Sequence, residues 1–402
     1  MLIRLQCPDT IVTPDAKYRR WIRSTLLGWY GRCKRDLPWR RINDPYAIWL
    51  SEVMLQQTQV ATVIPYYERF RSRFLTVQDL AEADLQEVLR LWAGLGYYAR
   101  ARNLHRTARR VVQDFGGRFP ETAAELRRLP GVGRYIAGAV ASMAFEERAP
   151  VVDGNVVRVL ARLFGSRQNA RTTAGREAFW RLAEVLLPET RCGDFNQALM
   201  ELGATVCLPG RAARCEACPL QKKCVAYATE AVIDLPNKPA KRAVKCETHI
   251  IAAIGRSGRW LFVRRPARGL WGGLWEMPSA VLDCKTTARE AARIARTTVA
   301  SPAWAIDPQP FCDFRHQLTH RTIRLVGHVC RVRSGGNRRA AVKARALGPR
   351  APEEQTSEPR WLPLEKAGLL GLSRAMQKVI AMLQASLATS PPVGKLRRWS
   401  PE

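Results

Sequence analysis

Apolar residues along the first half of the chain recur at helical spacing, from residue 17 to about residue 230. A clear example has the spacing i, i+3, i+4, i+7 and consists of Leu85, Val88, Leu89 and Trp92. Thr76 or Asp79 could cap the start of this helix. Further helices are expected over residues 121–128, 134–145 and 178–187. This half shows no convincing strand alternation, so we expect it to be mostly α-helical.

The pattern changes in the second half of the chain. Residues 235–245 are rich in Pro and Lys and contain no aromatic residue, which is typical of an extended linker. Beyond them, short strands are expected over residues 249–254, 260–263 and 322–330, with a helix near residues 287–298. The second half is therefore expected to be α+β.

These patterns predict two domains joined by a linker. The expected ranges are a helical domain over residues 17–232, a linker over 233–246, an α+β domain over 247–385 and a basic tail over 386–402. Residues 331–350 carry seven basic residues and no acidic one, which indicates a solvated basic loop rather than a specific site.

The chain is strongly basic, with 65 Lys and Arg against 35 Asp and Glu and a net charge of +30 over 402 residues. This excess favours a polyanionic partner such as DNA, although an Arg-rich composition alone would give the same balance. The sequence has no run of about 18 apolar residues, so we expect no membrane span and no membrane partner. Its first residues lack the apolar core of a secretion signal, so a cytoplasmic protein is expected.

A glycine-rich turn separates two of the expected helices, at Leu129-Pro-Gly-Val-Gly133. Gly131 and Gly133 permit a tight turn with positive φ and leave backbone N–H groups exposed at the start of the next helix. Such N–H groups bind phosphate well. An ordinary turn between helices is the alternative. The segment resembles the helix-hairpin-helix motif, which holds one DNA strand by its backbone.

Four of the 11 cysteines are separated by only seven, two and five residues, and these are Cys207, Cys215, Cys218 and Cys224. Thiolates grouped in this way form a soft-ligand metal site, and ligand type alone allows zinc or a 4Fe–4S cluster. Zinc ribbons usually use two close pairs, whereas this chain has one. The segment resembles the iron–sulfur loop of the endonuclease III superfamily, whose first gap is usually one residue shorter. We therefore expect one 4Fe–4S cluster, with Arg211 and Arg214 presented to DNA.

Two acidic residues stand out because each is alone in an apolar or neutral run, and these are Glu52 and Asp153. A helix cap is the alternative for either residue, especially for Asp153 before its Gly-Asn pair. As a pair they suit cleavage of an N-glycosidic bond, which needs a proton on the leaving base and an anion near the cationic sugar. This chemistry requires a protonated Glu and an ionised Asp.

Five segments resemble motifs of the A/G-specific adenine glycosylase family and occur in the family's order. They are Leu37-Pro-Trp-Arg40, Ser51-Glu-Val-Met-Leu-Gln-Gln-Thr58, Gly94-Leu-Gly-Tyr-Tyr-Ala-Arg100, Leu129-Pro-Gly-Val-Gly-Arg-Tyr135 and Val152-Asp-Gly-Asn-Val156. The resemblance covers residues from about 20 to about 225. It implies a monomeric helix-hairpin-helix enzyme that removes adenine paired with 8-oxoguanine or guanine in double-stranded DNA.

The resemblance also implies roles for individual residues. Glu52 would protonate adenine N7 and later activate water. Asp153 would stabilise the oxocarbenium ion or form a transient covalent link to the sugar, and Tyr135 and Asn155 would position the two carboxylates. Related bifunctional enzymes have a catalytic Lys at the position of Tyr135, so a monofunctional glycosylase without an efficient lyase step is expected.

Other residues would bind the substrate if the resemblance holds. The adenine pocket would be lined by Trp39, Arg40 and Leu55. Gln57 and Tyr97 would wedge into the base stack in place of the flipped base. Further contacts with DNA are expected from Thr58, Leu95, Gly131 and Gly133.

Residues 269–278 resemble a segment of Nudix-like domains. A working Nudix hydrolase also needs two further acids beside its Arg-Glu helix to hold Mg²⁺, and these are missing from residues 289–294. A nucleotide pyrophosphatase is therefore disfavoured. A third class, a non-catalytic iron–sulfur module that binds DNA, would keep the hairpin and the cysteines without needing Glu52 or Asp153.

In adenine glycosylases the Nudix-like domain recognises 8-oxoguanine. Residues 314–320 resemble the loop that does so, with Thr319 where some members have Ser, followed by His320. The spacing of His316 and His320 could suggest a metal pair on a helix, but a third ligand is not evident.

Overall fold

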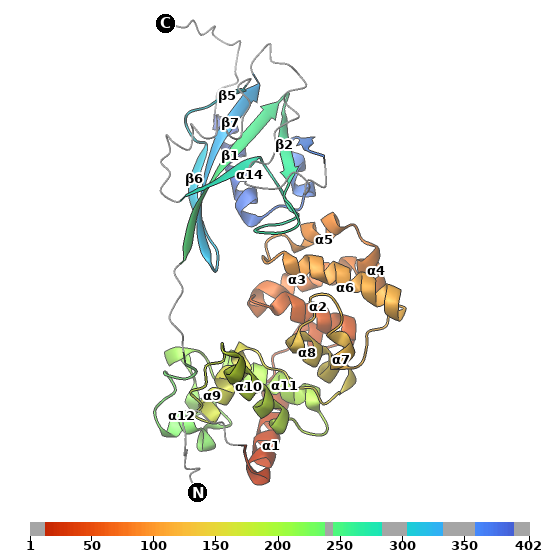
Figure 1. The fold of residues 1–402 in the computed structure, drawn as a ribbon, viewed down its shortest axis with the longest axis vertical. Coiled ribbons are helices and arrows are strands. Elements are labelled where there is room, and N and C mark those ends of the chain that lie inside the picture. Colours follow the sequence, from red (N-terminus) through yellow and green to blue (C-terminus); the bar gives the residue numbers. More distant parts are fainter. Residues whose placement is uncertain (1–12, 238–243, 284–303, 333–357, 390–402) are drawn as a thin grey trace, which may run out of the picture. The chain divides into compact units, whose positions relative to one another are not determined.

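The computed structural model describes residues 13–237, 244–283, 304–332 and 358–389 (Figure 1). The chain divides into two compact units. The first comprises Met1–Ala83 and Arg102–Lys241, and the second comprises Asp84–Ala101 and Arg242–Glu402. A short stretch of the helical half is thus grouped with the C-terminal part. None of the described helices is both long and apolar enough to cross a membrane.

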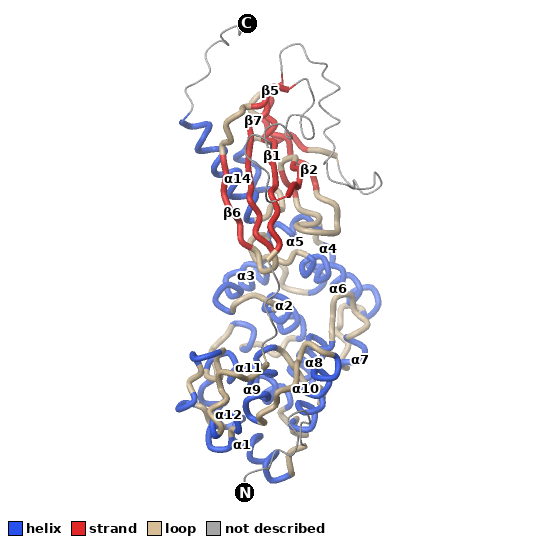
Figure 2. Tube along the Cα trace, turned by 60° about the vertical axis from the view of Figure 1, so that its left-hand side comes forward, coloured by secondary structure: helices blue, strands red, loops and turns tan. Residues whose placement is uncertain are grey.

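The first unit is built from helices, which confirms the expected fold class for this half (Figure 2). The α-helices are α1 (Ala16–Cys33), α2 (Pro45–Leu55), α3 (Val60–Arg73), α4 (Val77–Glu82), α6 (Ala99–Phe115), α7 (Ala123–Leu126), α8 (Arg134–Phe145), α9 (Gly154–Leu163), α10 (Thr173–Leu186), α11 (Cys192–Thr205) and α12 (Val225–Ala228). The 3-10 helices are η1 (Pro38–Arg40), η2 (Gly210–Ala212), η3 (Cys215–Ala217) and η4 (Gln221–Lys223). Helix α6 begins in the second unit and continues into the first.

Capping residues explain several helix boundaries. Thr76 and Asp79 form a capping box at the start of α4. The expectation that one of them caps the helix over residues 85–92 is therefore wrong, because Asp84 caps that helix, α5 (Leu85–Trp92). Apolar spacing alone did not separate α4 from α5 because the two helices nearly adjoin. The helix expected over residues 134–145 coincides with α8.

Two apolar helices, α2 and α8, form the interior beside the candidate functional site described below. Helices α2 and α8 carry apolar residues around most of their circumference, so they are buried rather than amphipathic. Helix α2 is buried from Tyr46 to Met54, and α8 is buried from Ile136 to Ser142. Any polar side chain on the inner faces of these helices is consequently removed from water.

The second unit contains α5, a mixed sheet, the 3-10 helix η8 (Leu364–Leu369) and α14 (Arg374–Thr389). Its strands are β1 (Lys245–Arg256), β2 (Arg259–Arg264), β3 (Trp275–Glu276), β4 (Ser279–Asp283), β5 (Trp304–Ile306), β6 (Cys312–Gln317), β7 (Arg321–Val332) and β8 (Arg360–Leu362). The main order is β3-β2-β1-β7-β5, and β4, β6 and β8 pair with β1, β7 and β2. Strands β1 and β7 are parallel, whereas the other pairs are antiparallel.

Alternate residues of β1 enter two different cores, as the period of two in a strand requires. Ile251 and Ala253 pack in the core that includes Val379 of α14, while Ile250 and Ile254 belong to the core on the other face. The strands expected over three segments lie within β1, β2 and β7. The α+β expectation for the second half is confirmed.

Other expectations for this half need correction or fall outside the described residues. The expected basic loop at 331–350 begins too early in the chain, because β7 continues through Val332; the remainder of the range is outside the described residues. The expected tail at 386–402 overlaps α14, which continues through Thr389. The helix expected near 287–298 also lies outside the described residues. His316 lies in strand β6, so it forms no helical pair with His320.

Candidate functional site

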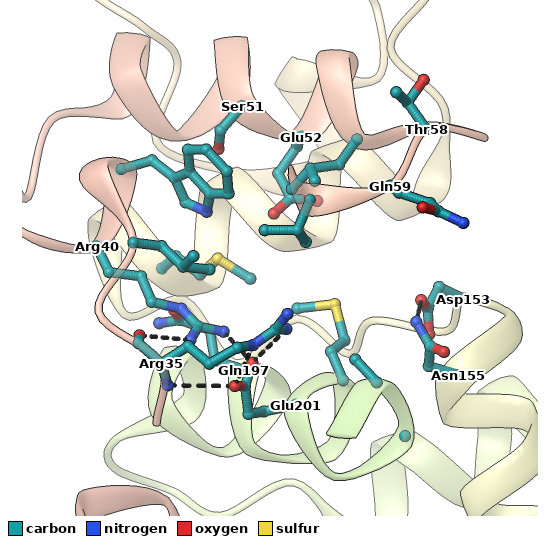
Figure 3. A pocket seen from close by; sticks show the side chains of 18 of the residues that line it. Arg35, Arg40, Ser51, Glu52, Thr58, Gln59, Asp153, Asn155, Gln197 and Glu201 are labelled. Atoms are coloured by element: carbon teal, nitrogen blue, oxygen red, sulfur yellow. Dashed lines mark hydrogen bonds and ion pairs between the residues drawn. The ribbon is translucent and has the colours of Figure 1, made fainter. Parts of the chain in front are cut away.

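A cavity of about 630 Å³ lies among α2, α8, α9 and α11 of the first unit (Figure 3). Residues singled out in the sequence that line it are Trp39, Arg40, Glu52, Leu55, Thr58, Tyr135, Asp153 and Asn155. They come from three separate segments of the chain, and the helical fold brings these segments together around one space.

Glu52 enters this cavity from buried helix α2 and is only 5% exposed. The hydroxyl of Tyr135 donates a hydrogen bond of 2.5 Å to Glu52 Oε2. Burial, the largest influence, raises the pKa of Glu52 to about 7; the charge of Asp153 also raises it, whereas the Tyr135 hydrogen bond and Arg40 lower it. Glu52 can therefore hold a proton near neutral pH and release it readily.

Asp153 is both a helix cap and part of the cavity wall. Its Oδ1 accepts a 2.7 Å hydrogen bond from the backbone N–H of Val156, at the start of α9. Its Oδ2 accepts a 2.8 Å hydrogen bond from Asn155 Nδ2. Burial raises the pKa of Asp153, and these hydrogen bonds oppose that rise. Figure 3 shows Asp153 and Asn155 across the cavity from Glu52.

A second buried acid, Glu201 on α11, forms ion pairs with two arginines. Arg35 Nε lies 2.7 Å from Glu201 Oε1, and Arg40 Nη2 lies 2.8 Å from Glu201 Oε2. A further hydrogen bond of 2.9 Å joins Arg35 Nη2 to Oε2. Burial raises the pKa of Glu201, but the hydrogen bonds and charges of both arginines outweigh burial and lower it. Glu201 is thus held ionised in the same cavity.

Sequence analysis missed several polar residues that line this cavity, among them Arg35, Gln197 and Glu201. Glu201, like Glu52, is an acid alone in an apolar run. The sequence could therefore have revealed it. Arg35 could not be found in this way, since one more Arg in a basic chain is not distinctive.

Arg158 on α9 connects the Asp153 side of the cavity to the cysteine segment. Its Nη2 donates 2.7 Å hydrogen bonds to Asn155 Oδ1 and to the carbonyl of Gly203. Its Nε donates a 2.7 Å hydrogen bond to the carbonyl of Cys207. Because Asn155 donates in turn to Asp153, the orientation of that acid depends on the backbone at Cys207.

The four clustered cysteines line a second, smaller cavity of about 30 Å³, and these are Cys207, Cys215, Cys218 and Cys224. Other walls are largely apolar and include Val159 and Leu202. Arg162 is buried, and its Nη1 donates to Cys207 Sγ at 3.3 Å. Within the described ranges, no group of three or more His, Cys, Asp or Glu side chains is arranged to hold a metal ion. All four cysteines nevertheless line this one small cavity.

The two glycines of the hairpin between α7 and α8 have different backbone conformations. Gly131 has a φ of +76°, and a Cβ there would meet the Asn103 side chain at 2.6 Å. Gly133 caps α8 in an extended conformation, and nothing lies within 4 Å of the Cβ that it lacks. Only Gly131 therefore requires glycine for backbone reasons. Gly133 is also exposed, so a ligand can approach the start of α8.

The remaining residues expected to contact DNA lie outside the cavity. Gln57 follows α2 with a positive φ of 56°. In the second unit, Tyr97 has a φ of 48°, and its hydroxyl donates a 2.6 Å hydrogen bond to Thr319 Oγ1. Leu95 is buried, whereas His320 is exposed. The structure thus brings Tyr97 and Thr319 together although they are far apart in the sequence.

Comparisons with known proteins identify the family. The family model described as "HhH-GPD superfamily base excision DNA repair protein" matches residues 50–184, and a NUDIX domain model matches residues 249–382. "Adenine DNA glycosylase" from Homo sapiens is 38% identical, covering 90% of this chain and 74% of its own length. The protein of the same name from Mus musculus is 37% identical and covers 90% and 78%. The chain belongs to the adenine DNA glycosylase family.

The enzyme is therefore a base excision repair glycosylase, a hydrolase that acts on N-glycosyl bonds of DNA. Its helical domain and its Nudix-like domain agree with the fold class expected from the sequence. A solved structure described as "a thermostable thymine-DNA glycosylase" covers 53% of this chain and 98% of its own, with 36% identity and a TM-score of 0.49.

Replacing Glu52 by Gln is expected to stabilise the folded enzyme at pH 8 but to change its stability little at pH 4. The pKa of Glu52 is raised to about 7 in the fold, so the neutral carboxyl favours folding at low pH. This stabilisation by the neutral carboxyl is lost as the pH rises from the ordinary pKa of a glutamate through about 7. The gain at pH 8 should be about 1–3 kcal/mol, measured by urea unfolding.

Glu184→Gln, on the exposed face of α10, is the matched control and should change the free energy of unfolding by less than about 0.5 kcal/mol. Equal destabilisation by Glu52→Gln at both pH values would show that burial does not raise the pKa of this carboxyl.

Proposed function

We propose that the enzyme hydrolyses the bond between adenine and deoxyribose in duplex DNA, where the adenine faces 8-oxoguanine or guanine. The flipped adenine would occupy the cavity around Glu52. One observation carries the proposal: a carboxyl whose pKa is raised to about 7 shares a cavity with a second acid, Asp153. This is the pairing that N-glycosidic cleavage requires.

The reaction would begin with transfer of the Glu52 proton to adenine N7. The bond between C1′ and N9 then breaks, its electron pair goes to the base, and the sugar becomes an oxocarbenium cation. Asp153 would stabilise this cation as an anion or bond transiently to C1′. Ionised Glu52 would finally take a proton from water, whose oxygen bonds to C1′. Tyr135 and Asn155 would position the two carboxyls through the hydrogen bonds described above.

Adenine would be held by the walls of the cavity. Trp39 and Leu55 would contact the faces of the base, and Arg40 would lie at its edge. Arg40 Nε is buried without a hydrogen-bond partner among the described residues, which supports a polar contact with the ligand. The Arg35 carbonyl and the Glu201 carboxylate accept hydrogen bonds from the two other nitrogens of the Arg40 guanidinium, so the enzyme would offer a preset donor to the base.

The DNA backbone and stack would be held outside the cavity. Exposed N–H groups beside Gly131 and Gly133 would bind a phosphate. Gln57 and Tyr97 would enter the base stack, with a further contact from Leu95, and Thr58 would contact DNA from the wall of the cavity. We propose that the enzyme acts as a monomer.

The Nudix-like domain would recognise the base opposite adenine. Thr319 carries a hydroxyl at an exposed turn beside His320, and Tyr97 contacts that hydroxyl. Such groups can hydrogen-bond the edge of 8-oxoguanine. We further propose domain boundaries at 17–232, 233–246 and 247–385.

The four cysteine thiolates would hold one 4Fe–4S cluster. Each thiolate binds a different iron in such a cluster, so the ligands must surround a space, and these four cysteines line one small cavity. When bound, the cluster would tie together the segment from Cys207 to Cys224. Arg162 would hold Cys207, and Arg158 would link the backbone of this fixed loop to Asn155.

The function predicts that adenine is released from a duplex with adenine opposite 8-oxoguanine, and that strand scission follows only after alkali. Tyr135 cannot form the Schiff base of a lyase, so scission before alkali would contradict a monofunctional mechanism. The single-turnover rate should fall as the pH rises through about 7, because the acid form of Glu52 is lost. Glu52→Gln should bind this duplex with nearly parental affinity but fail to release adenine, and its retained turnover would refute the proposed acid.

Gly133→Ala is expected to weaken DNA binding about tenfold, or about 1.4 kcal/mol, and to lower the free energy of unfolding by no more than about 1 kcal/mol, the usual loss for Ala at a helix N-cap. Apart from its neighbours in the chain, no described residue has an atom within 4 Å of the added Cβ, so the added methyl group would meet a bound phosphate. Fluorescence anisotropy in the Glu52→Gln background measures this affinity. Gly131→Ala should instead lower the unfolding temperature, because φ is +76° there. Parental DNA affinity in Gly133→Ala would exclude phosphate binding at this helix start.

Purified enzyme is expected to be brown and to contain iron and labile sulfide in equal amounts. Cys215→Ser should lose most of the visible absorption, because one ligand of the cluster is removed. Cys33→Ser, at an exposed thiol on α1, is the matched control and should keep the colour. Colourless enzyme that contains zinc would overturn the cluster assignment.

A further inference from the structure

Residues 84–101 lie between two segments of the first unit but pack as part of the second unit. This stretch contains α5 and the loop that carries Tyr97. The apolar side of α5 is buried at Val88, Leu89 and Trp92. This helix and its loop are held in place by the C-terminal part of the unit.

Two residues of the C-terminal part, Trp275 and Gly371, contact α5. Trp275 Nε1 donates a 2.9 Å hydrogen bond to Gln86 Oε1 on α5. A Cβ added at Gly371 would lie 3.3 Å from Leu89 Cβ, so the backbone at Gly371 touches the helix directly. Trp275 also donates from its backbone N–H to the Gly371 carbonyl at 2.9 Å. These two contacts with α5 therefore come from one hydrogen-bonded piece of the C-terminal domain.

The loop after α5 has a conformation that needs such support. Gly94, Gly96 and Tyr97 have positive φ values of 101°, 77° and 48°. A left-handed backbone at a tyrosine is uncommon and costs free energy, so it persists only where the surroundings hold it. Arg100 donates to the carbonyls of Leu95 and Gly96 at 3.2 and 3.3 Å.

The C-terminal domain also contacts this loop at its far end. Tyr98 hydroxyl donates to the carbonyl of Leu372 at 3.4 Å and accepts from the N–H of Gly94 at 3.2 Å. Tyr97 reaches Thr319. Leu372 immediately follows Gly371, so helix and loop are held by the same short segment.

We propose that Trp275, Gly371 and Leu372 are positioning residues, through which the C-terminal domain sets the position of the Tyr97 loop for insertion into DNA. The domain thus has a function besides recognition of the base opposite adenine. The role in DNA insertion rests on the proposed function, but the docking of α5 does not. The two parts can be tested separately.

The packing of α5 against the segment at Gly371 is tested by an engineered disulfide in the full-length holoenzyme. Cβ atoms in disulfides are about 3.8 Å apart, close to the separation at residues 89 and 371. The variant Leu89→Cys/Gly371→Cys should form this bond under mild oxidation, identified by mass spectrometry of peptides. Leu89→Cys/Gly368→Cys is the matched control, because Gly368 is exposed with nothing within 4 Å of its missing Cβ. Equal cross-linking in both variants, or none in either, would overturn the docking.

Positioning is tested by Gly371→Leu, which would push α5 away, beside the control Gly368→Leu. Gly371→Leu should weaken binding to a duplex with adenine opposite 8-oxoguanine about tenfold. It should also reduce the enzyme's preference for 8-oxoguanine over guanine as the base opposite adenine. Its single-turnover excision rate at saturating enzyme should stay within about twofold of the parent, because the Glu52 cavity lies in the other unit. Gly368→Leu should match the parent in both measurements.

Restored binding in Leu89→Ala/Gly371→Leu would support contact at this position, since the swap returns space to the interface. Parental binding by Gly371→Leu would overturn the positioning role, as would an equal loss in Gly368→Leu. If the parent itself releases no adenine, the proposed function fails, while the disulfide result still decides whether α5 docks.

Discussion

The proposed chemistry depends on Glu52, a carboxyl group that is buried and forms no ion pair with any described residue. Two guanidinium groups, Arg35 and Arg40, line the cavity of Glu52, and an ion pair with either would keep that acid ionised. Both arginines instead pair with Glu201, while Glu52 accepts its hydrogen bond from neutral Tyr135. Glu201 therefore offsets the positive charge that would otherwise remove the Glu52 proton. The two acids have opposite pKa shifts because their partners differ.

Hydrogen bonds at Asp153 oppose the rise in its pKa that burial causes, although burial has the larger effect. A backbone N–H at the start of α9 and the amide of Asn155 both stabilise its anionic form, against the effect of burial. The same bonds cap the helix, so the structural and chemical explanations for this residue are not alternatives. Arg158 extends the arrangement to Cys207. A disturbed cysteine loop would thus reorient an acid that it does not touch.

Much of the fold could be predicted from the sequence because the deciding signals are local. Gly133 followed by an apolar run defined α8, and alternating residues defined the strands of the C-terminal half. Glu52 and Asp153 could be found because an isolated acid in an apolar run is unusual. The ion pairs of Glu201 could not, since they join segments that meet only after folding. For the same reason, nothing local shows that α5 packs with the C-terminal unit.

Helix α2 connects the proposed acid to one proposed wedge. Glu52 lies on its buried face, and Gln57 follows its end with a left-handed backbone. A buried helix is rigid, so any shift of α2 would move both groups together. Tyr97 has the same uncommon backbone but is held by the C-terminal unit. Strain of this kind persists only where the surroundings hold it, and it is concentrated at functional positions. The positions of the two proposed wedges would therefore depend on different parts of the protein. The position of Gln57 would depend on the helix that carries Glu52, and that of Tyr97 on the domain that carries Thr319.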